Sequence, residues 1–278
     1  MSNGIVQNWM SSPVITVTPD TRLTEARRLM DENKIRALPV IQEGVLVGIV
    51  TRRGLLRLDL SQLDLQAWQK TTFLSEIRVK EVMSAKPITA SPSSRIPKVA
   101  RVMLENKITA VPVVSDERLV GILTNSDMMR FIISECTSSN QKASVENVMT
   151  DEVVTIQEDT SLLEAHRLMG TMRIRSLPVF QDDQLVGLVT RTNLMSSDLP
   201  RVAARNNQEL SFMVLTQPVE KIMSRDLITI RSDASITDAA RLMLDYKIHC
   251  LPVLNADNKL VGILTESDLF LLIVQKFF

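Results

Sequence analysis

Short apolar runs alternate with amphipathic stretches along the chain, and residues 145–198 show the pattern most clearly. A β-branched run, Val153–Ile156, is followed by polar residues and by Ser161-Leu162-Leu163-Glu164, which fits a capping box. Apolar residues then recur at helical spacing, at Leu162, Ala165, Leu168 and Met169. Two near-continuous apolar runs, LPVF and LVGLVT, flank a polar turn at Gln181–Gln184, which predicts a hairpin buried on both faces. A last helix follows, so the predicted order is β–α–β–β–α.

This pattern occurs four times in the 278 residues. The hairpin segments are ALPVIQEGVLVGIVT, AVPVVSDERLVGILT, SLPVFQDDQLVGLVT and CLPVLNADNKLVGILT, with prolines at Pro39, Pro112, Pro178 and Pro252. Each is preceded by a second matching block that begins near Met10, Met83, Met149 or Met223. The first and third methionines are 139 residues apart and the second and fourth 140, which indicates a two-copy unit duplicated whole. One copy is too small to bury its apolar faces, so we expect two copies to pack together around a shared core.

Composition narrows the class of protein. Hydrophobic residues make up 45% and charged residues 23%, as in folded globular proteins. The charges balance at 32 basic and 32 acidic residues, and aromatic residues are only 4%, so nucleic acid is not an expected partner. Two cysteines far apart favour a reducing, cytoplasmic location. No membrane partner is expected, because the apolar stretch Leu269–Val274 is too short to span a bilayer and the first nine residues do not resemble a signal peptide.

No signature of catalysis is found. The chain has no GxxxxGK[ST], GxGxxG, HExxH or nucleophile-elbow motif, and only two histidines. We therefore expect no enzyme activity, no metal site and no catalytic cofactor.

The combined pattern, M…P…TV…A…M…LPV…LVGIVT…D, resembles the cystathionine-β-synthase (CBS) domain, and it covers nearly the whole chain. The resemblance implies an α/β (α+β) fold in which four CBS motifs, at about 6–60, 79–136, 145–198 and 219–276, form two tandem Bateman modules. We predict modules at residues 1–138 and 139–278, packed into a flattened disc. Four such motifs in one chain resemble the regulatory gamma subunit of AMP-activated protein kinase.

The resemblance also implies where a nucleotide binds. The last helix of each copy begins near a threonine: Thr51, Thr124, Thr190 and Thr265. In the family an aspartate three residues later accepts the two ribose hydroxyls, and Thr or Ser hydroxyls reach phosphate. Copies two and four keep that aspartate, as Asp127 and Asp268, with Ser126 and Ser267 before them, whereas copies one and three have Gly54 and Asn193. The alternative is that these residues only cap helices. We predict one adenine nucleotide per module, at copies two and four.

Other parts of the predicted sites also follow from the resemblance. Arg36 and Arg175 stand where the family has phosphate-binding basic residues, and His249 and Thr109 occupy the same place in the even copies. Because paired copies face one another, Arg36 is expected to serve copy two and Arg175 copy four. The alternative for each arginine is a solvated surface charge. The predicted adenine walls and neighbouring residues are Ile88, Thr89, Val111 and Pro112 in the first module, and Ile228, Thr229, Leu251 and Pro252 in the second.

Two functions remain open at this point. The first is a regulatory protein that senses AMP, ADP or ATP and signals to a protein partner; S-adenosylmethionine is an alternative ligand. The second is an interaction scaffold with empty or degenerate clefts. Residues 57–78, with Leu58, Leu60, Leu63, Leu65, Trp68 and Phe73, form an amphipathic linker that either function could use, for partner binding or for packing along its own module. The identity of the partner and the oligomeric state, a homodimer included, are left open.

Overall fold

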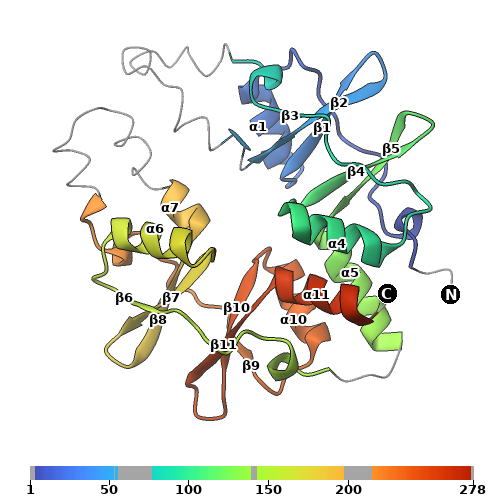
Figure 1. Ribbon diagram of the computed structural model, residues 1–278. Helices are drawn as coiled ribbons and strands as arrows, with labels where there is room; N and C mark the ends of the chain where they lie inside the picture. The colour runs from blue at the N-terminus through green and yellow to red at the C-terminus, as the bar shows by residue number, and fades with distance from the viewer. Residues whose placement is uncertain (1–3, 53, 56–76, 139–142, 197–214, 277–278) are drawn as a thin grey trace, which may run out of the picture.

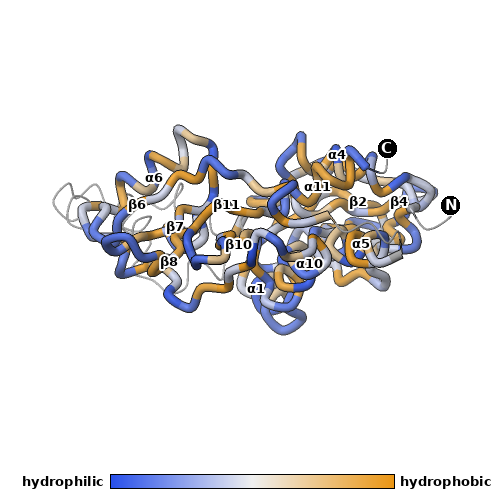
Figure 2. The backbone as a smooth tube through the Cα atoms, turned by 90° about the horizontal axis from the view of Figure 1, so that it is seen from below, coloured by the Kyte–Doolittle hydropathy of each residue, from blue (hydrophilic) through white to orange (hydrophobic). Residues whose placement is uncertain are grey.

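The computed structural model describes residues 4–52, 54–55, 77–138, 143–196 and 215–276. Four β–α–β–β–α copies lie around a ring (Figure 1), and the edge-on view in Figure 2 shows a molecule that is thinner than it is wide. The predicted fold class, four motifs paired into two modules in a disc, is confirmed. The amphipathic linker expected at residues 57–78 lies almost wholly outside the described residues.

The first module contains copies one and two. Copy one has α1 (Leu23–Glu32), β1 (Ala37–Gln42) and β2 (Val45–Thr51). Copy two has β3 (Ser84–Ala85), α4 (Ile96–Asn106), β4 (Ala110–Ser115), β5 (Arg118–Thr124) and α5 (Asn125–Ser138). The two hairpins join into one sheet in the order β1-β2-β5-β4, with β3 added to β2. Short 3-10 turns begin the copies at Val6–Asn8 and Val79–Glu81.

The second module repeats this plan in copies three and four. Copy three has a 3-10 turn (Val145–Asn147), β6 (Ile156–Gln157), α6 (Leu162–Thr171), β7 (Ser176–Gln181), β8 (Gln184–Thr190) and α7 (Arg191–Ser196). Copy four has a 3-10 turn (Val219–Lys221), β9 (Ile230–Arg231), α10 (Ile236–Asp245), β10 (Cys250–Leu254), β11 (Leu260–Thr265) and α11 (Glu266–Lys276). The strands of the second module form two three-stranded sheets, β6-β7-β8 in copy three and β11-β10-β9 in copy four.

The first strand of each copy is shorter than its apolar run predicts. Val14–Val17 makes only an isolated parallel bridge, in which the Val17 N–H donates to Pro39 O at 3.1 Å and Val17 O accepts from Ile41 N at 2.8 Å. In copy three the run Val153–Ile156 contributes only the start of β6. The reason is that the preceding residues pair with the partner copy instead of with their own.

Each copy begins on the hairpin of its partner. Ser11 of copy one exchanges two backbone hydrogen bonds with Ile122 of β5, at 2.9 and 3.1 Å. Thr150 of copy three does the same with Ile263 of β11, at 3.0 and 2.9 Å. The reverse exchanges place β3 on β2 and Ser224 on β8. Paired copies are therefore held together by backbone hydrogen bonds from the opening segment of each copy to the hairpin of the other.

At each of these contacts between paired copies, a methionine of one copy packs against a glycine of the other. The glycine of every LVGxxT segment leaves a notch on the strand, and the sulfur of the partner's first methionine fills the position where a Cβ would stand. This explains why the glycine and the methionine both recur at fixed places in the repeat. The pairs are Met10 with Gly121, Met83 with Gly48, Met149 with Gly262 and Met223 with Gly187.

The largest apolar core crosses between the modules. It is built from the helices of copies two and four, with α5 packed on α10 and α4 packed on α11. Phe131, Met128 and Ile132 of α5 and Leu269 and Ile273 of α11 are almost completely buried in it. Two smaller cores are centred on copies one and three, and the opening residues of copies two and four, Val79 and Val219 among them, pack into these cores. The sequence predicted shared cores within modules, and a small cluster of Ile49, Ala110 and Ile122 does join copies one and two. The sequence gave no sign that the main core would join copies two and four.

Candidate functional site

The four helix starts share one backbone hydrogen bond. The first helical residue donates its N–H to the carbonyl of the residue just before the hairpin, so the side chains of these two residues lie beside each other. Copies one and three each bring two arginines together in this way, whereas the even copies combine Thr109 with Asn125 and His249 with Glu266. The bonds are Arg52 to Arg36 (2.8 Å), Asn125 to Thr109 (3.2 Å), Arg191 to Arg175 (2.8 Å) and Glu266 to His249 (3.1 Å).

The predicted ribose aspartates both cap their helices through one oxygen. Asp127 Oδ2 accepts from the backbone N–H and from Oγ1 of Thr124, each at 2.7 Å. Asp268 Oδ2 accepts the same two bonds from Thr265, again at 2.7 Å. In copy three Asn193 Oδ1 takes over this role and accepts from Thr190 N at 2.9 Å. The capping role is therefore real, but it occupies only one of the two carboxylate oxygens.

The two aspartates differ in the partners of their second carboxylate oxygen, Oδ1. Asp127 is completely buried, and its Oδ1 accepts from Ser11 Oγ at 3.3 Å and forms an ion pair with Arg130. Asp268 is partly exposed, and its Oδ1 accepts no hydrogen bond from the described residues. Burial raises the pKa of the Asp268 carboxyl, while the hydrogen bonds from Thr265 and from the backbone N–H of Asp268 itself oppose that rise. Asp268 Oδ1 is thus an acceptor oxygen to which no other described residue donates a hydrogen bond.

A polar cluster joins the modules near these helix starts. Glu266 Oε2 accepts from Asn125 Nδ2 of copy two and lies 2.9 Å from His249 Nδ1 of its own copy. His249 Nε2 also contacts Arg36 of copy one, whose Nη2 donates to Lys247 O at 2.8 Å. Partial burial lowers the pKa of Arg36, Glu266 raises it and Arg52 lowers it. Three copies therefore meet at Glu266 and His249.

The cluster places Arg36 beside copy four, and the predicted roles of Arg36 and Arg175 toward a phosphate at copies two and four stay predictions. Arg36 contacts copy four, and it is not among the described partners of Asp127 in copy two. Arg175 is exposed, and no hydrogen bond from its guanidinium is found within the described ranges. Asn125, Glu266, Ser11 and Arg130 were not predicted as site residues. Only Arg130, one helical turn after Asp127, could have been found from sequence spacing, because the other contacts depend on how copies pack.

The predicted adenine walls fall into two groups. Val111 and Leu251 are at most 1% exposed and belong to the main core, and Pro112 and Pro252 are also buried. Ile88 and Thr89 are exposed, and Ile228 and Thr229 are partly exposed. Ser126 and Ser267 are exposed on their helices. The exposed and partly exposed residues offer surface to a ligand, and the assignment of the six wall residues, of Thr89 and Thr229 and of the two serines stays a prediction.

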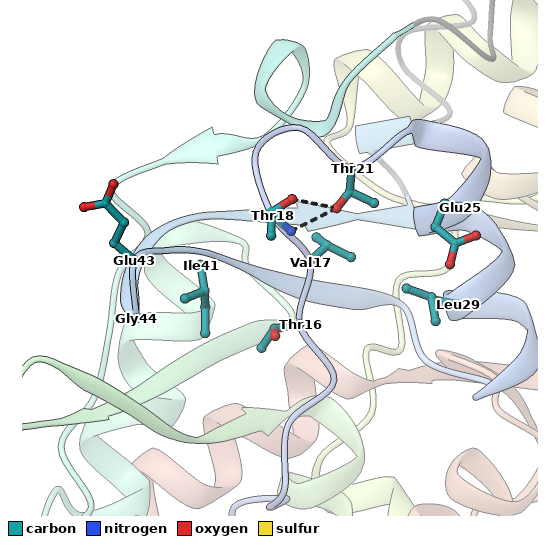
Figure 3. Close-up of a pocket in the computed structure, with 9 residues that line it drawn as sticks. All are labelled: Thr16, Val17, Thr18, Thr21, Glu25, Leu29, Ile41, Glu43 and Gly44. Carbon is teal, nitrogen blue, oxygen red and sulfur yellow. Dashed lines mark hydrogen bonds between the residues drawn. The ribbon is translucent and has the colours of Figure 1, made fainter.

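A pocket of about 430 Å³ lies elsewhere, lined by residues of copy one (Figure 3). The turn that leads into α1 lines it, and in this turn Thr18 N and Oγ1 each lie 3.0 Å from Thr21 Oγ1. Glu25 and Glu43 make its rim acidic. None of the predicted nucleotide-site residues lines it. The complete lining is Thr16, Val17, Thr18, Thr21, Glu25, Leu29, Ile41, Glu43 and Gly44.

The described ranges contain neither a metal site nor a membrane span. Within them, no group of three His, Cys, Asp or Glu side chains is placed to hold a metal ion. No helix in that part of the chain combines the length and apolar character needed to cross a bilayer.

Paired copies that exchange backbone hydrogen bonds through their first segments, with Thr–Asp caps at the starts of α5 and α11, define a tandem-repeat α/β protein. The CBS domain model matches residues 6–61, 79–134, 145–199 and 219–275. This chain belongs to the CBS-domain family.

Relatives of similar organisation exist in archaea. The uncharacterized protein MJ1225 of Methanocaldococcus jannaschii is 28% identical over 92% of this chain and 93% of its own length. MJ1404 of the same organism is 30% identical over 97% of this chain, which corresponds to 62% of MJ1404. The crystal structure of MJ1225, a protein proposed as an archaeal homologue of g-AMPK, matches 96% of this chain with a TM-score of 0.72 and 24% identity. An inosine-5'-monophosphate dehydrogenase of Thermoplasma acidophilum is matched over only 22% of its length, at 31% identity over 45% of this chain.

Proposed function

We propose that this chain is a non-catalytic, cytoplasmic regulatory protein that binds an adenine nucleotide (AMP, ADP or ATP) at Asp268 and at Asp127 and signals occupancy to a protein partner. The observation that carries the proposal is the Oδ1 of Asp268, to which no other described residue donates, beside an Oδ2 that accepts two hydrogen bonds from Thr265. A fixed carboxylate with an open oxygen suits a vicinal diol, whose two hydroxyls donate charge-assisted hydrogen bonds. The start of α11 adds free backbone N–H groups and a favourable dipole for an anion.

The cluster at the module interface fits the phosphate end of such a ligand. Glu266 stands two residues before Asp268 and holds His249, which contacts Arg36. A nucleotide with its ribose at Asp268 would extend its phosphate toward these two basic side chains. The signal to a partner would then arise because three copies meet at this point, so that a bound phosphate alters how the modules sit against each other. The enzyme relatives support a regulatory role, since they share only the CBS portion of their length with this chain.

The first test is a thermal shift and calorimetric titration of the whole chain with AMP, ADP, ATP and S-adenosylmethionine. A ligand that binds only the folded state raises the melting temperature, by several degrees at high saturation. A shift with an adenine nucleotide supports the proposal. A shift with S-adenosylmethionine alone would identify that ligand instead, and no shift with any of them would favour the second candidate function, an interaction scaffold.

Asp268→Ala should weaken the binding of adenosine and AMP alike, because both carry the ribose diol. The loss of charge-assisted hydrogen bonds worth about 1.5–3 kcal/mol lowers affinity at least about tenfold. Asn193→Ala is the matched control, because it removes the equivalent cap in copy three without touching a predicted site. Equal affinity in Asp268→Ala and wild type would refute the assignment of Asp268.

Arg36→Ala should weaken the binding of AMP and leave that of adenosine nearly unchanged, because only a phosphate engages the guanidinium. Calorimetric titration with each ligand measures the contrast. Arg175→Ala, which removes the matching arginine of copy three, shows whether one or both arginines serve a phosphate. An equal loss for adenosine and AMP in Arg36→Ala would mean that Arg36 acts through its contact with His249 and not through phosphate.

A further inference from the structure

The helix starts at Thr124 and Thr265 share the TxSD motif, but their aspartates differ in which residues cover the carboxylate. In copy two, Asp127 Oδ1 is occupied by Ser11 Oγ and by the guanidinium of Arg130, and the carboxylate is 0% exposed. Arg130 lies one turn further along α5, and its own side chain is 49% exposed. The ion pair therefore closes over the carboxylate from the solvent side.

Copy four lacks this cover. Leu271 occupies the place of Arg130 on α11, and it is 48% exposed and has no charge to offer. Thr150 takes the place of Ser11 on the facing copy, and no hydrogen bond joins it to Asp268. The two sites thus differ in the residue three positions after the aspartate, while the cap formed by Thr124 or Thr265 is the same in both.

The consequence for binding follows from the charges. A ribose diol offers two neutral hydroxyl donors, and at Asp268 they meet an oxygen that the described residues leave free. At Asp127 the same diol must first displace a guanidinium, whose ionised hydrogen bond to the carboxylate is stronger than one from a neutral hydroxyl. Because Arg130 is half-exposed, it can leave the carboxylate by swinging into solvent, so the site is closed reversibly.

We infer that Arg130 is an internal competitor for the ribose site of copy two, so that the copy-four site fills first and the copy-two site only at higher nucleotide concentration. This inference rests on the proposed function and deepens it, since it names the residue that makes the two sites unequal. A chain with one open and one self-closed site responds over a wider range of nucleotide concentration than a chain with two equal sites.

The test isolates one site at a time in the full-length chain and titrates it calorimetrically with AMP and with adenosine. In an Asp268→Ala background, which leaves copy two, Arg130→Leu should raise the affinity for both ligands at least about tenfold. In an Asp127→Ala background, which leaves copy four, Leu271→Arg should lower the affinity for both by a similar factor. Each substitution gives one copy the residue that the other copy carries.

Adenosine separates competition from phosphate binding. If Arg130 instead binds phosphate, Arg130→Leu would lower AMP affinity and leave adenosine unchanged, and the inference would be wrong. Unchanged affinity for both ligands would overturn it as well. Removing a partner from the buried Asp127 carboxylate can cost stability, so Arg130→Gln, which keeps a donor but no charge, is the second variant. Leu271→Arg lies at an exposed position and tests the same idea without that cost.

The outcome also separates this inference from the proposed function. If Asp127→Ala protein binds AMP and its affinity does not depend on residue 271, the proposed function stands and the inference fails. If neither single-site background binds AMP or adenosine, the proposed function fails and the inference falls with it.

Discussion

Gly121→Ala should lower the free energy of unfolding by about 1–3 kcal/mol, the usual cost of overpacking a filled interior. A Cβ at this position would lie 2.8 Å from Met10 Cγ and 3.2 Å from Met10 Cβ, so the stem of the methionine and not only its flexible end must move. Met10 stands next to Ser11, whose two backbone bonds hold copy one on β5. Chemical denaturation followed by circular dichroism measures the loss.

The chain supplies its own control for this substitution. Gly170 lies near the end of α6, and a Cβ there would meet nothing within 4 Å. Gly170→Ala should therefore stabilise the protein by about 0.5–1 kcal/mol, because alanine loses less backbone entropy in a helix. The double variant Met10→Ala with Gly121→Ala should be less destabilised than the sum of its parts, since each change makes room for the other. Additive effects would show that the notch and the methionine are not coupled.

Asp268→Asn should weaken nucleotide binding at copy four and raise the stability of the folded protein at pH 7. Asparagine offers one acceptor oxygen, and Asn193 in copy three shows that this oxygen can serve the cap alone. No acceptor oxygen then remains for the ribose diol, so AMP affinity should fall at least about tenfold. The stability should rise because burial raises the pKa of the Asp268 carboxyl, which means that the folded state disfavours its ionised form.

The stability difference between wild type and Asp268→Asn should depend on pH. A carboxyl with a raised pKa binds its proton more readily in the folded chain, so ionisation subtracts from stability at every pH above the folded pKa. The penalty shrinks as the pH falls through the raised pKa and is gone below the ordinary value of about 3.9. Melting temperatures of wild type and Asp268→Asn should therefore differ most at neutral pH and converge in acid. A variant that melts lower than wild type at pH 7 would contradict the prediction.

Local sequence patterns were enough to predict the helix cap and the hairpin within a single copy. The N-cap at Ser161, confirmed by the bond from Glu164 N to Ser161 Oγ at 3.2 Å, and the LPV hairpins depend only on residues near in the chain. The other half of the predicted capping box is not found among the described residues, where the Glu164 carboxylate accepts from Arg167 instead. The four-copy fold followed because the repeat is explicit. The apolar run Val14–Val17 misled the strand prediction, since its neighbours bind the partner copy and leave one bridge in their own.

Contacts between copies could not be predicted in the same way. The Thr–Asp cap at Asp268 is local and was expected, but the cover of Asp127 by Ser11 comes from a residue 116 positions away. The cluster of Arg36, His249 and Glu266 depends on how the second module meets the first, and no pattern within a copy encodes that placement. Spacing can identify the residues of a site but not which copies will share it.

The core between copies two and four has a consequence for the history of the chain. The interface pairs α5 with α10 and α4 with α11, so each half contributes one first helix and one last helix, as in a twofold-symmetric contact. A chain of half this length would expose those apolar helices unless it met a second copy of itself in the same arrangement. An ancestor with two copies is therefore expected to have worked as a dimer, and the duplication that joined its halves freed each half to change separately, which is how Arg130 and Leu271 could come to differ.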